Sequence, residues 1–109
     1  MSNHVFVVSE WLAKENHEQE LREQFKKLLK ISLENEPGCI SARVTQQVKH
    51  PGAPSSSKYT IVLLQEYADV EAFDLHCKTE YVAEFFKNCI ENKETAIVEH
   101  WQCRLLSEY

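Results

Sequence analysis

The chain has little glycine, no long apolar run and no surplus of positive charge. Only two of its 109 residues are glycine. Neither forms a Gly-x-Gly-x-x-Gly or phosphate-loop pattern, so we expect no nucleotide site. No apolar run approaches the ~18 residues of a membrane span. A formal net charge of −5 argues against nucleic acid, whose partners usually present a basic face. These absences predict a protein that binds neither membranes nor nucleic acid.

Metal-ligand and disulfide patterns are also missing. The five histidines and four cysteines show no His-x-x-His, His-Glu-x-x-His or Cys-x-x-Cys spacing. No serine lies in a Gly-x-Ser-x-Gly context, so a nucleophilic triad is not indicated. We therefore expect reduced thiols, no metal and no bound cofactor. The first residues lack the basic region and apolar core of a secretion signal, so we expect a cytoplasmic protein.

What the sequence does contain is a succession of strand and helix patterns in the order β-α-β-β-α-β, with a length that suits one domain over residues 1–109. Strands are expected at 5–11, 40–48, 59–67 and 96–106. Helices are expected from 14–16 to 35, at 69–77 and at 79–92. Two prolines and three serines make 49–57 a loop, whose role the sequence leaves open. This order predicts an α+β, ferredoxin-like fold with a four-stranded antiparallel sheet and helices on one face.

The long helices have one apolar face each, which is typical of helices that cover a sheet. In the first helix this face comprises Leu21, Phe25, Leu28, Leu29 and Leu33. In the last helix it comprises Val82, Phe85, Phe86, Cys89 and Ile90.

Three strand segments are apolar at consecutive positions: 5–8, 61–64 and 96–98. Successive strand residues point to opposite faces, and an antiparallel sheet with one wet face should alternate apolar and polar residues. Helices cover only one face, and leaving the other wet would forgo roughly 1.5–3 kcal/mol for each large side chain. A second copy of the sheet is the simplest cover. The strand composition therefore predicts a homodimer.

One longer pattern carries a family resemblance. Glu36-Pro37-Gly38-Cys39 is a helix-stop and turn signal followed by a strand. After the next strand comes Ala72-Phe73-Asp74-Leu75-His76-Cys77-Lys78-Thr79-Glu80-Tyr81. Together these segments resemble the antibiotic-biosynthesis monooxygenases of the dimeric α/β-barrel superfamily, over roughly residues 4 to 106. The resemblance implies a cofactor-independent monooxygenase that acts on an aromatic, quinol-type small molecule.

His76 is the residue to which the resemblance assigns chemistry. By spacing alone, Val70, Phe73 and His76 share one side of a short helix, and a lone histidine there is usually a core residue or answers the helix dipole. The resemblance instead implies a catalytic His76 that faces a cavity and moves a substrate proton. It further implies that the substrate is bound by Tyr67, Gln65, Trp11 and Tyr81. The alternative for the aromatic residues is an ordinary core.

Two positions depart from the family pattern. Gln65 stands where a glutamate is common and Glu80 where a second histidine is common, and glutamine cannot act as a base. Two alternatives therefore stay open: isomerase-like processing of a small sugar-derived signal of the autoinducer-2 type, or a non-catalytic ligand-binding or stress-related dimer. Haem-degrading relatives are disfavoured, because the first strand has no asparagine and the third ends in Tyr67 instead of tryptophan.

Overall fold

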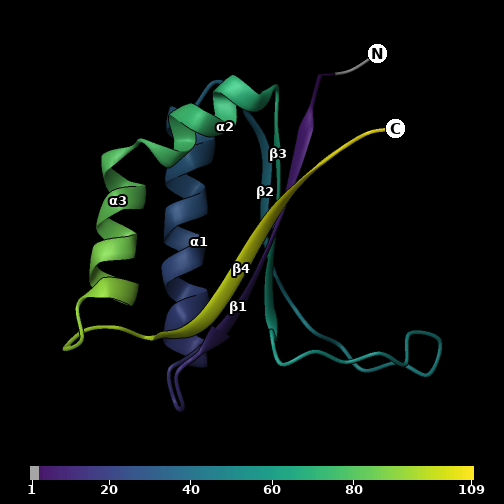
Figure 1. Cartoon of the computed structure of the whole chain (residues 1–109), viewed down its shortest axis with the longest axis vertical. Coiled ribbons are helices and arrows are strands. Elements are labelled where there is room, and N and C mark those ends of the chain that lie inside the picture. The colour runs from purple at the N-terminus through teal and green to yellow at the C-terminus, as the bar shows by residue number, and fades with distance from the viewer. Residues whose placement is uncertain (1–2) are drawn as a thin grey trace.

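The computed structural model describes residues 3–109 as a four-stranded antiparallel sheet with the helices on one face (Figure 1). The sheet order is β2-β3-β1-β4, which is the ferredoxin-like arrangement, so the predicted fold is confirmed. The elements are β1 (Val5–Ala13), α1 (Glu18–Asn35), β2 (Cys39–Gln46), β3 (Ile61–Tyr67), α2 (Val70–Cys77), α3 (Glu80–Phe86), the π-helix η1 (Lys87–Glu91) and β4 (Val98–Ser107). None of the helices within residues 3–109 is long and apolar enough to cross a membrane.

The register of the sheet places the inward side chains in rows beneath the helices. Val7 is opposite Gln65 on β3, and Ser9 lies between Leu63 on β3 and Cys103 on β4. Trp11 is opposite Trp101 on β4. Because side chains alternate between the faces of a strand, these rows form one continuous surface across three strands.

The core lies between this surface and the helices. Its larger cluster gathers around Trp11, Phe25 and Phe85, and a smaller one contains Val5, Val7, Cys39 and Tyr67. Helix α1 buries Leu21, Phe25, Leu29 and Ser32. The prediction that Leu33 points inward is wrong, because its side chain is 45% exposed. One step along a helix rotates a side chain by about 100°, so burying Ser32 turns Leu33 away from the sheet.

The Glu-Pro-Gly turn joins the end of α1 to β2 and lies against the start of α2. The backbone N–H of Cys39 donates to the Glu36 carbonyl at 3.0 Å, and that of Ala68 donates to the Gly38 carbonyl at 2.8 Å. A Cβ at Gly38 would lie only 2.4 Å from Cβ of Ala72 on α2. Glycine therefore permits the close approach that brings Glu36 beside α2.

Several element boundaries differ from the sequence expectations. Helix α1 begins at Glu18 and not near residue 14, because Asn16 adopts a positive φ of 69° and the His17 N–H donates to the Lys14 carbonyl in a turn. The helix expected over 79–92 changes at Lys87 into η1. Strands β2 and β3 are shorter than expected at the ends joined by residues 47–60. That segment projects as an arm from the end of the sheet opposite α2 (Figure 1).

Candidate active site

His76 lies in the last turn of α2 and is buried, with 8% of its surface exposed. Between ring centroids, His76 is 5.3 Å from Tyr67 and 6.1 Å from Phe73, on which it stacks. The expectation that Val70 shares this buried side is wrong, since Val70 is 47% exposed. A three-residue step drifts by about 60° on a helix, so the first member of the series falls off the buried stripe.

Glu36 is the direct partner of His76. The Nδ1 atom of His76 lies 3.0 Å and 3.1 Å from the two carboxylate oxygens of Glu36, and 3.4 Å from Oγ of Ser32. The side chains of His76 and Glu36 are only 10% and 11% exposed. In the sequence, Glu36 is recognisable only as part of the Glu-Pro-Gly helix-stop signal. No local pattern indicated this contact, because it joins residues 40 positions apart.

The pairing defines which nitrogen of His76 carries its proton. A carboxylate only accepts hydrogen bonds, so the neutral imidazole donates from Nδ1 and keeps its lone pair on Nε2. Glu36 is fixed in turn by Tyr81, whose hydroxyl donates to Oε2. Burial, followed by the hydrogen bond and the charge of Glu36, raises the pKa of Tyr81 to about 12. Tyr81 therefore remains a protonated donor at neutral pH.

A cavity of about 170 Å³ lies between the helices and the sheet, and His76, Gln65 and Trp11 all line it. Tyr67 lies just outside it and is fully buried. Gln65 donates from Nε2 to the Tyr67 hydroxyl at 2.9 Å. Burial is the largest cause of a strongly raised Tyr67 pKa, so this phenol does not ionise at neutral pH. The structure thus brings together three of the five predicted site residues, with Tyr67 directly behind them.

Aromatic rings form much of the cavity wall. Trp11 stacks on Trp101 at 5.0 Å between centroids and contacts Phe25 at 4.8 Å. The Trp11 indole N–H donates to Oγ of Ser9 at 2.9 Å. Trp101 is 41% exposed, and the cavity-lining Cys77 and Cys103 are exposed as well. The cavity therefore opens to solvent beside the edge strand β4.

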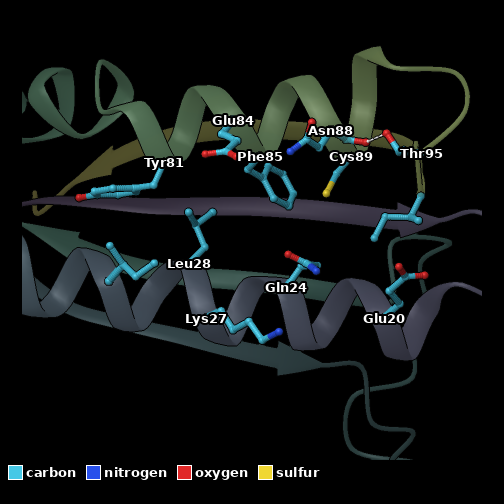
Figure 2. A pocket seen from close by; sticks show the side chains of 12 residues that line it. Glu20, Gln24, Lys27, Leu28, Tyr81, Glu84, Phe85, Asn88, Cys89 and Thr95 are labelled. Carbon is cyan, nitrogen blue, oxygen red and sulfur yellow. Dashed lines mark hydrogen bonds between the residues drawn. The ribbon is translucent and has the colours of Figure 1, made fainter.

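Tyr81, the fifth predicted site residue, lines a different groove (Figure 2). This groove has a volume of about 390 Å³ and runs between α1 and α3. Its walls carry charged and amide side chains, among them Glu20, Gln24, Lys27 and Glu84. Although it is larger, it does not include His76. Within residues 3–109, no group of three or more His, Cys, Asp or Glu side chains is arranged to hold a metal ion.

The sequence model of the antibiotic biosynthesis monooxygenase family matches residues 4–88. The chain belongs to this family. The matched range includes Glu36, Gln65, Tyr67, His76 and Tyr81, whereas Trp101 and the rest of β4 lie beyond it. The family resemblance inferred from the sequence is thereby confirmed. No curated protein matches the chain.

Solved structures show how widely this antibiotic biosynthesis monooxygenase fold is shared. A conserved protein from Methanosarcina mazei Go1 has a TM-score of 0.76 at 22% identity, with 97% of this chain and 93% of that chain covered. A candidate antibiotic biosynthesis monooxygenase from Caulobacter crescentus CB15 has a TM-score of 0.76 at 18% identity, with 99% and 92% covered. Another from Nitrosomonas europaea has a TM-score of 0.77 at 13% identity, with 99% and 92% covered. At these identities the likeness shows the fold alone.

Proposed function

We propose that this protein is a cofactor-independent monooxygenase that oxidises a phenolic or quinol-type ring, with His76 as the general base. The observation that supports this most is the Glu36–His76 pair at the wall of an aromatic cavity. Gln65 and Trp11 would position the ring, Tyr67 would act through its hydrogen bond with Gln65, and Tyr81 would act through Glu36. The family match supports this general class of reaction.

The reaction starts with transfer of the substrate hydroxyl proton to Nε2 of His76. Glu36 stabilises the imidazolium that forms, and the mostly apolar walls strengthen this charge interaction by excluding water. The substrate anion then supplies the electrons that reduce O₂. One oxygen atom enters the ring and the other leaves as water. A hydroquinone and O₂ thus give a hydroxyquinone and water, which balances atoms and electrons without a further reductant.

The test is oxygen consumption with a panel of hydroquinones, comparing the wild type with His76→Ala. Loss of a general base should lower turnover by roughly 10²–10⁴-fold. His50→Ala is the matched control, because His50 is exposed in the 47–60 arm and does not line the cavity. Circular dichroism would establish that both variants are folded. Full turnover by folded His76→Ala would show that His76 is not the base.

A non-catalytic ligand-binding dimer is the second candidate, and Gln65 is the observation that favours it. The neutral amide occupies a position on the cavity wall where it hydrogen-bonds Tyr67 and cannot take a proton. Tight binding of a phenol without any oxygen uptake would support this candidate. Isomerisation of a sugar-derived signal fits less well, because a polar ligand finds few partners on this wall.

We also propose that the protein is a homodimer. The face of the sheet away from the helices carries exposed Phe6 and Leu64 and the half-buried Val8 and Val62. These side chains lie on neighbouring strands, since β1 pairs with β3. A second copy of the same face would remove this apolar surface from water.

A further inference from the structure

We propose that the cavity selects a single hydroxylated aromatic ring without a negative charge, that is, a monocyclic phenol or hydroquinone. This inference rests on the proposed function for the reaction, but the selectivity for the ring is a separate property that binding measures directly. Three features of the cavity carry it: its size, the type of hydrogen-bonding atom at its polar end, and the absence of a cation to pair with an acid.

Size limits the ligand to one ring. The cavity measures about 170 Å³, and an apolar cavity of about 150 Å³ holds one benzene molecule. The available space therefore suits one six-membered ring with small substituents. A fused second ring would have to displace the packed side chains on the wall.

The wall opposite the polar end resists such displacement. Phe25, Phe85 and Trp11 are buried and in mutual ring contact, at 4.8, 5.1 and 5.9 Å between centroids. Close-packed side chains in a core yield only at a cost, so added volume is poorly tolerated. Phe86 is only partly buried and is the ring on this wall that is easiest to remove.

The polar end of the cavity suits a hydroxyl, which donates and accepts hydrogen bonds. Gln65 uses one N–H of Nε2 for its bond to Tyr67, which leaves its second N–H and its carbonyl oxygen Oε1. His76 uses Nδ1 for Glu36, which leaves the lone pair of Nε2. The hydroxyl of Ser9 already accepts the Trp11 N–H. A substrate hydroxyl can donate to Gln65 Oε1 or His76 Nε2 and can also accept from the Ser9 hydroxyl or the second Gln65 N–H, whereas a carbonyl or ether oxygen can only accept and leaves Oε1 and Nε2 unused.

Charge excludes aromatic acids. In the described part of the chain, none of the residues that line the cavity is a lysine or an arginine. A carboxylate lies directly behind the wall, since Glu36 is 3.0 Å from Nδ1 of His76. A phenol brings the proton that converts His76 into an imidazolium, but a benzoate arrives already ionised. It would therefore be buried beside a neutral imidazole and close to the negative charge of Glu36, which is unfavourable. A neutral phenol avoids both costs.

Cysteine footprinting tests this selectivity without relying on turnover. Cys77 and Cys103 line the cavity and are exposed, whereas Cys39 and Cys89 are buried. Burial raises the pKa of both cavity thiols, so alkylation by iodoacetamide should be followed by mass spectrometry at one fixed, mildly alkaline pH. Saturating methylhydroquinone should slow the labelling of Cys77 and Cys103 severalfold. A naphthalenediol or benzoate at the same concentration should leave both rates unchanged.

Two variants make the size argument sharper. Phe86→Ala should allow the naphthalenediol to protect the same cysteines, whereas Phe6→Ala on the opposite face of the sheet should not. Cys103→Phe, which adds volume at an exposed position, should abolish protection of Cys77 by methylhydroquinone. If Phe86→Ala does not fold, the Cys103→Phe result still decides whether the ligand occupies this cavity.

The outcomes separate this inference from the proposed function. Protection of the wild type by the naphthalenediol as strong as that by methylhydroquinone would overturn the single-ring limit, and protection by benzoate would overturn the charge argument. Oxidation of a two-ring quinol by the wild type would also overturn the inference while supporting the oxygenase. Protection by methylhydroquinone alone without its oxidation would support the inference and contradict the oxygenase.

Discussion

At the scale of single residues, the site depends on a chain of three groups: Tyr81 donates to Glu36, and Glu36 contacts His76. Only His76 of these three lines the cavity. Glu36 and Tyr81 are therefore positioning residues, which act on substrate through the orientation and charge of the imidazole.

Replacing Glu36 by glutamine should separate positioning from binding. Glu36→Gln removes the negative charge that stabilises the imidazolium, and a glutamine amide can also donate to Nδ1 and so favour the wrong tautomer. We expect kcat to fall by roughly 10²–10⁴-fold, as for other groups that orient a general base. KM should change little, because Glu36 does not line the cavity.

Glu34→Gln is the matched control for this variant, since Glu34 is an exposed carboxylate two residues earlier, in the last turn of α1. It should leave kcat unchanged. A Glu36→Gln enzyme whose kcat equals that of the wild type would show that the carboxylate does not assist His76.

Tyr81 predicts a specific change in stability at alkaline pH. Its pKa is raised to about 12 in the folded protein, from an ordinary value of 10.0. The folded protein therefore keeps this proton where the unfolded chain loses it, and stability falls as the pH rises from 10 towards 12. The Tyr81→Phe variant lacks this titration. The difference in free energy of unfolding between wild type and Tyr81→Phe should consequently shrink over that range.

Urea denaturation at neutral pH and at two alkaline pH values would measure this difference. Taking the difference between the two proteins cancels the contributions of other groups that both contain, including Tyr67. If the difference in free energy of unfolding grew with pH, the pKa of Tyr81 would be lowered and not raised by folding.

At the scale of elements, the contact between the Glu-Pro-Gly turn and α2 holds the two halves of the site together. Gly38 has no room for a side chain, because its Cβ would lie 2.4 Å from that of Ala72. Gly38→Ala should therefore destabilise the protein by about 1–3 kcal/mol, the usual cost of overpacking. It should also lower turnover, since separating the turn from α2 separates Glu36 from His76.

Gly52→Ala is the control for Gly38→Ala. An added Cβ at Gly52 would meet only the His50 ring in the exposed arm, at 3.1 Å or more, so the expected change is within about 0.5 kcal/mol. Ala72→Gly should reduce the effect of Gly38→Ala in a double-mutant cycle, because it removes the atom that clashes. Equal effects in both backgrounds would show that this contact does not restrict Gly38.

The sequence predicted the elements well and their ends less well. Apolar periodicity identified both the strands and the helices because burial of one face determines them. The ends depend on local backbone conformations, such as the positive φ of Asn16, that periodicity does not encode. The same limit applies to Leu33, which is next to the buried Ser32, and to Val70, which is three residues before Phe73. Both are exposed.

The candidate site was predictable only in part. His76, Gln65, Trp11 and Tyr67 follow from the family resemblance. Glu36, by contrast, pairs with His76 across 40 positions, through a tertiary contact with no sequence signature. The resemblance also implied that Tyr81 binds the substrate, yet its hydroxyl donates to Glu36 and its side chain lines the groove of Figure 2.

At the scale of the whole molecule, the uncovered face of the sheet predicts the oligomeric state. Burying large apolar side chains on this face stabilises a dimer by roughly 1.5–3 kcal/mol for each side chain fully removed from water. Size-exclusion chromatography with light scattering at micromolar concentration should give about twice the 12.7 kDa of one chain. Leu64→Glu should shift the protein towards monomer. Leu75→Glu, at an exposed position on α2, should not. A soluble wild-type monomer would contradict the prediction.

The arm over residues 47–60 has a practical consequence. Its backbone is held locally, by two hydrogen bonds between Gln47 and Ser57 and by a bridge between His50 and Ala53. It leaves the sheet at the end remote from α2 (Figure 1). Exposed tips of this kind tolerate insertions. A fluorescent reporter or a surface-coupling tag placed at the tip would leave the cavity accessible, which makes the arm a suitable attachment point for measuring ligand binding on an immobilised protein.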